Sequence, residues 1–146
     1  MFQSKNWLVP WHQDKTIITE RKSTLEGWGP WSKKDGVHHV QPPLKILNKI
    51  ITFRIHLDPS SIDNGCLKVL PNTHNSILST NEINKLVHSI NAVACAVNTG
   101  DILVMKPLIL HSYSKALSPA NRRVIHLEYG NFSLPQELQI NSAYSN

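Results

Sequence analysis

The chain has 146 residues, of which 40% are hydrophobic and 17% are charged, and its formal net charge is +5. This composition is typical of one folded globular domain and excludes a disordered chain. No apolar run approaches the ~20 residues that a membrane span needs, and residues 1–10 lack the basic and apolar regions of a signal peptide. We therefore expect a cytoplasmic protein without a membrane partner.

The charge pattern bears on which partners the protein binds, and the cysteines bear on its redox state. Lysines and arginines are scattered along the chain, without the basic stripe of a nucleic-acid-binding surface, so we expect no nucleic-acid partner. A basic surface still favours anionic small molecules. Cys66 and Cys95 each lie in a strand-like apolar run, and the sequence predicts that both are reduced core residues.

Taken in order, the sequence predicts short strands separated by turns. The first strand is expected between Trp7 and Ile18. The glycine- and proline-rich stretch 26–43 is expected to be a long loop that carries Trp28 and Trp31.

Residues 50–57 give the clearest strand signal, because apolar and polar side chains alternate along them. One face carries the polar side chains of Thr52, Arg54 and His56. The other face is apolar and consists of Ile51, Phe53, Ile55 and Leu57.

The second half of the chain continues this pattern. Further strands are expected at 66–70, 92–97, 102–110 and 122–129, and apolar residues at helical spacing predict one short surface helix at 81–91. Many short strands with so little helix predict an all-β sandwich or jelly roll.

A candidate metal site begins at His12. On a strand, His12 and Asp14 point the same way and Gln13 points the opposite way, so an imidazole and a carboxylate meet on one face. Two histidines and one carboxylate on one face of an octahedron are the ligands of non-heme Fe(II) oxygenases. His111, where the apolar run 102–110 meets a loop, is the candidate for the third ligand.

Other residues of the same types compete for these roles. His56 and Asp58 repeat the His-x-Asp spacing, but Asp58 opens an Asp-Pro turn, which it is expected to cap. An isolated histidine such as His111 is often a core residue. The other histidines expected on loops or on the surface are His38, His39, His74 and His88.

Arg122 is the candidate for holding a carboxylate in a bidentate fork, and its neighbour Arg123 is the competitor. If Arg122 faces inward, alternation places Arg123 outward. The inward positions that follow are then Val124, His126 and Glu128, and the outward ones are Ile125, Leu127 and Tyr129.

Four motifs follow one another in the order known from the phytanoyl-CoA dioxygenase family. They are WHQD at 11–14, DNGCLKVLPNTH at 63–74, GDILVMKPLILH at 100–111 and RRVIHLEY at 122–129. The chain resembles that family from Trp11 to Tyr129. Its members are double-stranded β-helix oxygenases, with a cupin-like jelly roll, that depend on Fe(II) and 2-oxoglutarate.

The resemblance implies roles for individual residues. His12, Asp14 and His111 would bind iron, and Arg122 rather than Arg123 would hold 2-oxoglutarate. Two further residues are expected near the cosubstrate. Arg54 stands where relatives often have an aromatic residue, and it would add a second cation for a carboxylate or an anionic substrate. Tyr113 stands where a serine is common, and its hydroxyl would bond a carboxylate of 2-oxoglutarate.

The implied activity is that of a 2-oxoglutarate-dependent dioxygenase that hydroxylates a small organic molecule. Asp14 favours hydroxylation over halogenation, because a halide needs the coordination position that the carboxylate fills. Hydrolysis at a zinc ion is an alternative that needs no 2-oxoglutarate.

The chain also departs from the family, whose members usually have helices and at least one strand before the His-x-Asp segment. The single domain expected at 1–146 would lack them, and an apolar sheet face would be exposed, which predicts self-association, a partner or poor solubility. A second alternative is therefore an inactive family member that acts as a metal-binding or interaction module.

Overall fold

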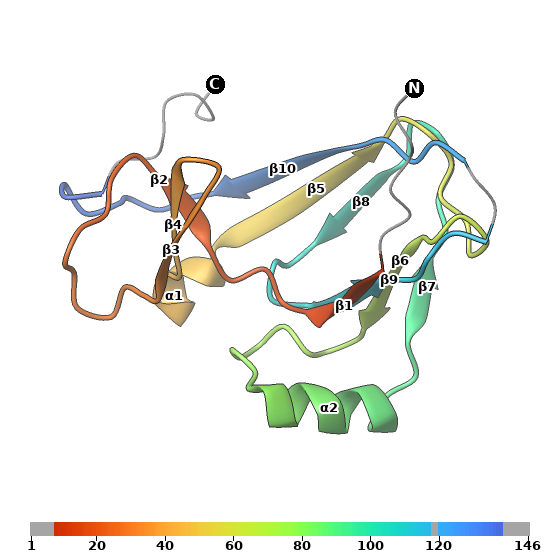
Figure 1. Ribbon diagram of the computed structural model, residues 1–146, viewed down its shortest axis with the longest axis horizontal. Coiled ribbons are helices and arrows are strands. Elements are labelled where there is room, and N and C mark those ends of the chain that lie inside the picture. The colour runs from red at the N-terminus through yellow and green to blue at the C-terminus, as the bar shows by residue number, and fades with distance from the viewer. Residues whose placement is uncertain (1–7, 118–119, 139–146) are drawn as a thin grey trace.

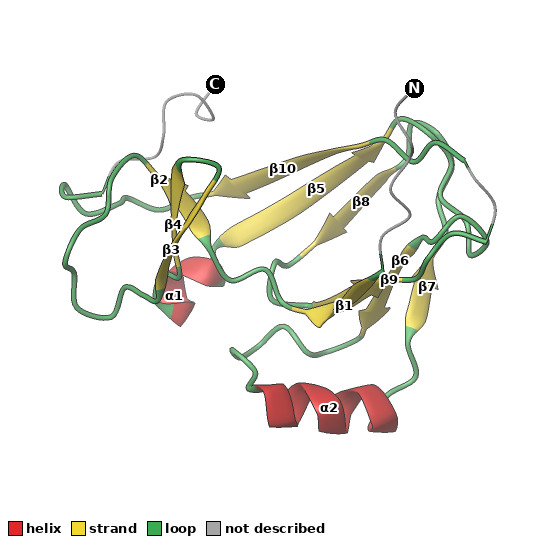
Figure 2. Cartoon of the chain, viewed as in Figure 1, coloured by secondary structure: helices red, strands yellow, loops and turns green. Residues whose placement is uncertain are grey.

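The computed structural model describes residues 8–117 and 120–138, so that Trp7 lies outside the described residues. Strands dominate this part of the chain, which contains two helices (Figure 1, Figure 2). The predicted all-β jelly roll with little helix is confirmed. The elements are β1 (Val9–His12), β2 (Ile17–Thr19), β3 (Trp31–Lys34), β4 (Val37–Val40), α1 (Leu44–Leu47), β5 (Ile50–His56), β6 (Leu67–Leu70), α2 (Thr80–Ser89), β7 (Val93–Cys95), β8 (Ile102–Met105), β9 (Leu110–Tyr113) and β10 (Val124–Gly130).

Two antiparallel sheets form the sandwich (Figure 1). One has the strand order β1-β9-β6-β7, and the other has the order β10-β5-β8. The guanidinium of Arg54 on β5 lies 5.5 Å from the ring centroid of Tyr113 on β9, so the inner faces of the two sheets meet. A third sheet, β2-β4-β3, lies at one end of the β10-β5-β8 sheet (Figure 1).

Helix α2 covers the outer face of the β1-β9-β6-β7 sheet (Figure 1). It begins with a capping box, in which the side chains of Ser79 and Glu82 each accept a hydrogen bond from the other residue's backbone N–H. Its apolar side packs against the buried Leu70 and Leu110 of the sheet. The predicted surface helix is confirmed. Among the described residues, no helix is long and apolar enough to cross a membrane.

The outer face of the β10-β5-β8 sheet is apolar and exposed in the part of the chain that the structure describes. The pairing register places apolar residues of all three strands in rows, such as Ile125, Ile55 and Ile102. The inner face of the same sheet buries Arg54 and His56, so the predicted alternation along β5 is confirmed, with the polar face inside. Large side chains at least 43% exposed on or beside the outer face are Leu57, Ile102, Val104, Ile125, Leu127 and Tyr129.

The first predicted strand is wrong as a continuous element. β1 pairs with β9 in the sandwich, whereas β2 pairs with β4 in the third sheet, and the chain crosses between the two sheets at residues 13–16. At this crossing the N–H of Asp14 donates to the carbonyl of Pro107 instead of joining a strand ladder. Alternation along a strand therefore does not explain the position of the Asp14 side chain.

The predicted long loop at 26–43 is also wrong, because it contains the β3-β4 hairpin. Asp35 and Gly36 have φ values of 48° and 83°, the positive values that a tight two-residue hairpin turn requires. His38 and His39 consequently lie on a strand and not on a loop.

The strand predicted at 102–110 consists of two strands, β8 and β9, that belong to different sheets. The break falls at Pro107, which has no N–H to donate to a ladder. His111 therefore lies within β9, opposite His12 on one side and Val69 on the other, and not where a strand meets a loop. The strands predicted at 66–70, 92–97 and 122–129 are confirmed as β6, β7 and β10.

Candidate active site

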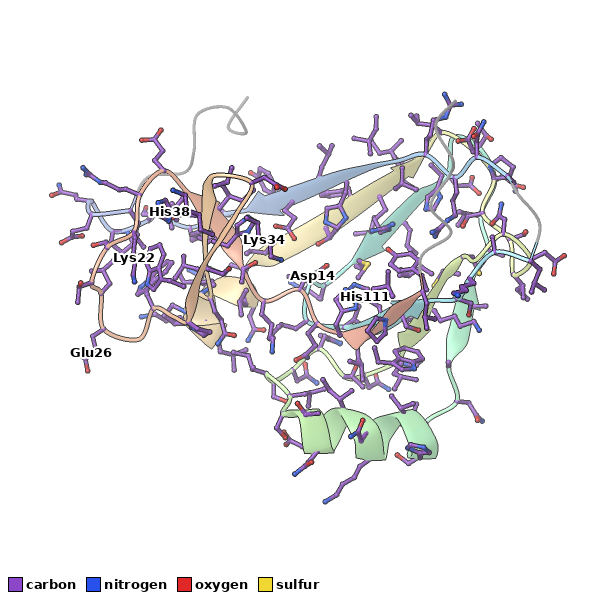
Figure 3. All side chains as sticks on the ribbon, in the orientation of Figure 1. Asp14, Lys22, Glu26, Lys34, His38 and His111 are labelled. Atoms are coloured by element: carbon purple, nitrogen blue, oxygen red, sulfur yellow. The ribbon has the colours of Figure 1, made fainter. Side chains whose placement is uncertain are left out.

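Three candidate metal ligands converge between the two sheets of the sandwich. His12 ends β1, Asp14 follows it, and His111 lies on the neighbouring β9. The ligand atoms of the three side chains lie within 4.8 Å of one another. Nε2 of His12 is 3.6 Å from Oδ1 of Asp14, and Nε2 of His111 is 3.5 Å from Oδ2. Figure 3 shows Asp14 and His111 side by side at this position.

Backbone carbonyl groups orient both imidazoles. Nδ1 of His12 donates to the carbonyl of Pro10 at 2.8 Å, and Nδ1 of His111 donates to that of Ile109 at 2.7 Å. A neutral imidazole that donates through Nδ1 has its free lone pair on Nε2. Both lone pairs therefore face Asp14, in the orientation that such hydrogen bonds give to metal-binding histidines.

The donor set fits a divalent transition metal such as Fe(II). Two lone pairs and a carboxylate face one another at distances too long for hydrogen bonds, and these electron-rich groups repel unless a cation lies between them. Burial lowers the pKa of His111, although the Asp14 carboxylate opposes the shift. This imidazole therefore favours the neutral form that a metal requires.

Gln13 points away from the ligands and is buried. Its amide nitrogen donates to the carbonyls of Leu108, at 2.6 Å, and Ser76, at 2.9 Å, and its amide oxygen accepts from the N–H of Leu78 at 2.8 Å. These bonds fix Gln13, which lies between the candidate ligands His12 and Asp14, and one of them joins it to the segment that leads to His111. The sequence predicted only that Gln13 points away from His12 and Asp14. A polar side chain on the face opposite the candidate ligands was the signal for its buried hydrogen bonds.

The rival His-x-Asp triplet does not form a metal site in this structure. The guanidinium of Arg123 binds Asp58 through two parallel hydrogen bonds, Nε to Oδ2 and a terminal nitrogen to Oδ1, each 2.9 Å long. These bonds lower the pKa of Asp58 to about 2. His56 is buried on the inner face of β5, away from this pair. Arg123 is therefore bound to Asp58 at the surface, which leaves Arg122 as the inward cation.

Arg54, Arg122 and Tyr113 come together beside the three ligands, as the sequence predicted. The guanidinium carbons of Arg122 and Arg54 lie 4.9 Å and 5.5 Å from the ring centroid of Tyr113. The Tyr113 ring in turn stands edge-on to the His111 ring, with centroids 6.4 Å apart. Burial raises the pKa of Tyr113, so its hydroxyl is a hydrogen-bond donor at neutral pH.

The inner face of β5 also carries buried polar atoms that have no hydrogen-bond partner among the described residues. They are Oγ1 of Thr52, Nε of Arg54 and both ring nitrogens of His56. Buried polar groups are normally paired, so these atoms fit a space that takes a polar ligand. Burial and the charges of Arg54 and Arg122 lower the pKa of His56, which identifies the space as cationic and suited to an anion. Sequence reasoning placed His56 on the same polar face as Arg54 but did not include it among the residues expected near the cosubstrate.

A second space, a pocket of about 590 Å³, lies on the other side of Asp14 between the third sheet and β10. Its polar lining includes His39, His126 and Glu128, and Phe132 adds apolar wall. The inward positions of His126 and Glu128 agree with the alternation predicted along β10, whereas His39 was expected on a loop or the surface. The structure therefore separates a cationic space beside Arg122 from a mostly apolar pocket beside Asp14.

The comparison with known families decides the relationship. The sequence profile described as phytanoyl-CoA dioxygenase (PhyH) matches residues 1–124. The chain belongs to the phytanoyl-CoA dioxygenase family. The predicted resemblance is thus confirmed over most of the chain, and the clustered His12, Asp14 and His111 lie within the matched residues.

Solved structures with the same fold include AviO1 from Streptomyces viridochromogenes Tue57, which is 24% identical with a TM-score of 0.58, over 89% of this chain and 46% of AviO1. HygX from Streptomyces hygroscopicus, with nickel and 2-oxoglutarate bound, is 17% identical with a TM-score of 0.52, over 88% and 52%. EctD from S. alaskensis with bound Fe is 18% identical with a TM-score of 0.53, over 80% and 45%.

This chain spans about half the length of these three solved proteins. No curated protein matches it. Iron and 2-oxoglutarate are the cofactors that the family and the groups bound in these structures indicate.

The bonds of Gln13 predict that Gln13→Leu destabilises the fold. The change leaves two carbonyls and one N–H unpaired in the interior, and each such loss costs about 1–3 kcal/mol. We expect the free energy of unfolding in urea to fall by at least about 3 kcal/mol in total. Gln136→Leu, at an exposed position, is the control. Equal stability of the two variants would show that the Gln13 bonds contribute nothing.

The Asp58–Arg123 pair predicts a pH-dependent contribution to stability. The pKa of Asp58 falls from its ordinary 3.8 to about 2 in the folded protein, so the contribution is complete above pH 3.8 and disappears as the pH falls through 2. Arg123→Gln should lower the melting temperature at pH 6, and the difference from the unmodified chain should shrink between pH 4 and pH 2. Lys33→Gln, which removes one exposed charge, should show no such trend.

Proposed function

We propose that this chain is an Fe(II)- and 2-oxoglutarate-dependent dioxygenase that hydroxylates a small organic molecule. The observation that carries the proposal is the convergence of two imidazole lone pairs and one carboxylate beside a buried cationic space. Membership of the phytanoyl-CoA dioxygenase family supports it. In this proposal His12, Asp14 and His111 would hold the metal.

The cationic space would bind 2-oxoglutarate. Arg122 and Arg54 would pair with a carboxylate of the cosubstrate, and the Tyr113 hydroxyl would donate to it. His56 would supply a further hydrogen bond from the inner face of β5. When bound, iron and 2-oxoglutarate would activate O₂, one oxygen atom of which would hydroxylate a C–H bond while the other would convert the cosubstrate to succinate and carbon dioxide.

The protein's own contribution is geometry and exclusion of water. Hydrogen bonds that the two imidazoles donate to backbone carbonyls fix their orientation before a metal arrives, so little reorganisation is needed on binding. Asp14 fills a coordination position that halogenation would need open, which supports hydroxylation.

The distribution of charge also bears on the substrate expected from the sequence. The arginines lie beside Tyr113 on the cosubstrate side, so they support an anionic cosubstrate and give no reason for an anionic substrate. A cytoplasmic location and the lack of a nucleic-acid partner stay predictions.

The test is the visible charge-transfer band that forms when Fe(II) and 2-oxoglutarate bind together without oxygen. The unmodified chain should show the band, and His12→Ala should lose it. Arg122→Gln should need at least about tenfold more 2-oxoglutarate, because one partner of a charged hydrogen-bonded pair is lost. His88→Ala on the exposed side of α2 is the control and should keep the band. No band in a folded, unmodified chain would exclude the proposal, and turnover with zinc alone would favour hydrolysis.

The exposed outer face of the β10-β5-β8 sheet is the one observation that favours the alternative of an interaction module. Rows of apolar side chains across three paired strands form a contiguous patch, and such patches commonly mediate association. We therefore retain self-association through this face as a proposal that is compatible with either function.

Self-association predicts a molar mass that depends on this face. The unmodified chain should exceed its monomer mass of 16.5 kDa in light scattering, and the mass should rise with concentration. Val104→Glu and Ile125→Glu should each shift the chain toward the monomer, because a buried unpaired charge opposes the contact. Val93→Glu, exposed on β7 of the other sheet, should leave the mass unchanged. A monomeric unmodified chain at every concentration would contradict the proposal.

A further inference from the structure

We propose that the 590 Å³ pocket beside Asp14 selects an uncharged substrate by a hydroxyl group, which it holds between His126 and Glu128. This inference rests on the proposed function, in which Asp14 binds the metal and the pocket next to it receives the molecule to be oxidised. It concerns the substrate class, which neither the family nor the motifs specify.

The pocket has the size and lining of a small-molecule site. Its volume falls within the ~300–1000 Å³ usual for such sites, and most of its wall is apolar. Near Asp14 the polar side chains of His39, His126 and Glu128 line it. The apolar residues that line it are Ile17, Ile18, Ile50, Leu127 and Phe132. A mostly apolar molecule with a polar group at one point therefore fits this pocket.

Arg54 decides which nitrogen of His126 faces the pocket as a donor. A guanidinium nitrogen of Arg54 lies 3.0 Å from Nδ1 of His126. Arginine has only donors, so Nδ1 must be the acceptor, and the proton of the ring lies on Nε2. Nε2 is therefore a hydrogen-bond donor directed toward Glu128.

His126 and Glu128 present their polar atoms side by side, so that one ligand oxygen can contact both. Nε2 of His126 lies 3.6 Å from Oε1 of Glu128, which is too long for a hydrogen bond. The two side chains are 36% and 34% exposed, so both remain accessible from the pocket. A ligand atom that accepts from Nε2–H and donates to the carboxylate would satisfy both groups at once.

A hydroxyl group meets this requirement, and the common charged groups do not. A carboxylate only accepts, and the negative charge of Glu128 repels it. An ammonium only donates, so it leaves the His126 N–H without an acceptor. A hydroxyl oxygen both accepts and donates.

The hydrogen bond between Arg54 and Nδ1 of His126 also argues against a second metal ion at this point. Asp14, His126 and Glu128 also lie close enough together to hold a cation. However, a ring that carries its proton on Nε2 has no lone pair there for a metal, and the Arg54 cation lies against its other nitrogen. The pair is better suited to an uncharged polar group.

Three probes of matched shape test the inference: cyclohexylmethanol, cyclohexylmethylamine and cyclohexanecarboxylic acid. Their affinities are measured by saturation-transfer NMR with zinc and 2-oxoglutarate present, so that no turnover occurs, and again without either. We expect the alcohol to bind at least about fivefold more tightly than the amine and the acid. In Glu128→Gln, the ratio of alcohol to acid affinity should fall by about tenfold, because repulsion of the acid is lost.

Ile125→Thr on the opposite face of β10 is the matched control, and it should keep the order of affinities. The histidine tautomer gives a second readout, since ¹⁵N NMR should find the proton of His126 on Nε2 in the unmodified chain and a mixture of tautomers in Arg54→Met. Tightest binding of the acid or the amine, no binding of any probe, or an unchanged ratio of alcohol to acid affinity in Glu128→Gln would each overturn the inference.

These outcomes are separable from failure of the proposed function. If the chain forms no charge-transfer band with iron but still prefers the alcohol without metal, the pocket assignment stands and the oxygenase assignment fails. If the band forms but the probes show no preference for the alcohol, the oxygenase assignment stands and the hydroxyl selection fails.

Discussion

The side-chain amide of Gln13 holds together the segments on which the candidate site depends. It lies where the chain leaves the sandwich for the third sheet. It bonds to backbone groups of Ser76, Leu78 and Leu108. Gln13 points away from the two candidate ligands on either side of it, and its bonds fix the backbone between them. A single buried amide thus links the path of the chain to the position of His12 and Asp14.

The β10-β5-β8 sheet reverses the usual arrangement of a half-exposed antiparallel sheet. Such sheets normally bury an apolar face and expose a polar one. Here the inner face carries Arg54 and His56, while the outer face presents rows of isoleucine, leucine and valine. Because polar side chains occupy the inner face of this sheet, the apolar side chains of its strands lie on the outer face, where they are exposed.

Much of the candidate site follows from the sequence, because motif order and residue type predict His12, Asp14, His111 and Arg122 without any coordinates. The structure brings these residues together, but the path of the chain between them cannot be predicted from local sequence patterns. Alternation assumes one strand through residue 18, whereas the chain changes sheets after His12. Pro107 and the Asp35-Gly36 dipeptide are visible in the sequence as a strand break and a hairpin turn. Which sheet each neighbouring strand joins is decided by long-range strand pairing, which local sequence does not show.

The contacts of Arg54 are of a kind that local sequence cannot supply, since they join β5 to β9 and β10. One guanidinium lies over the Tyr113 ring and also bonds to the His126 imidazole. The cationic space beside Tyr113 and the pocket lined by His126 thus share one cation. A ligand that displaces this group in one compartment changes the orientation of a donor in the other, which is the physical basis of a coupling free energy between two binding events.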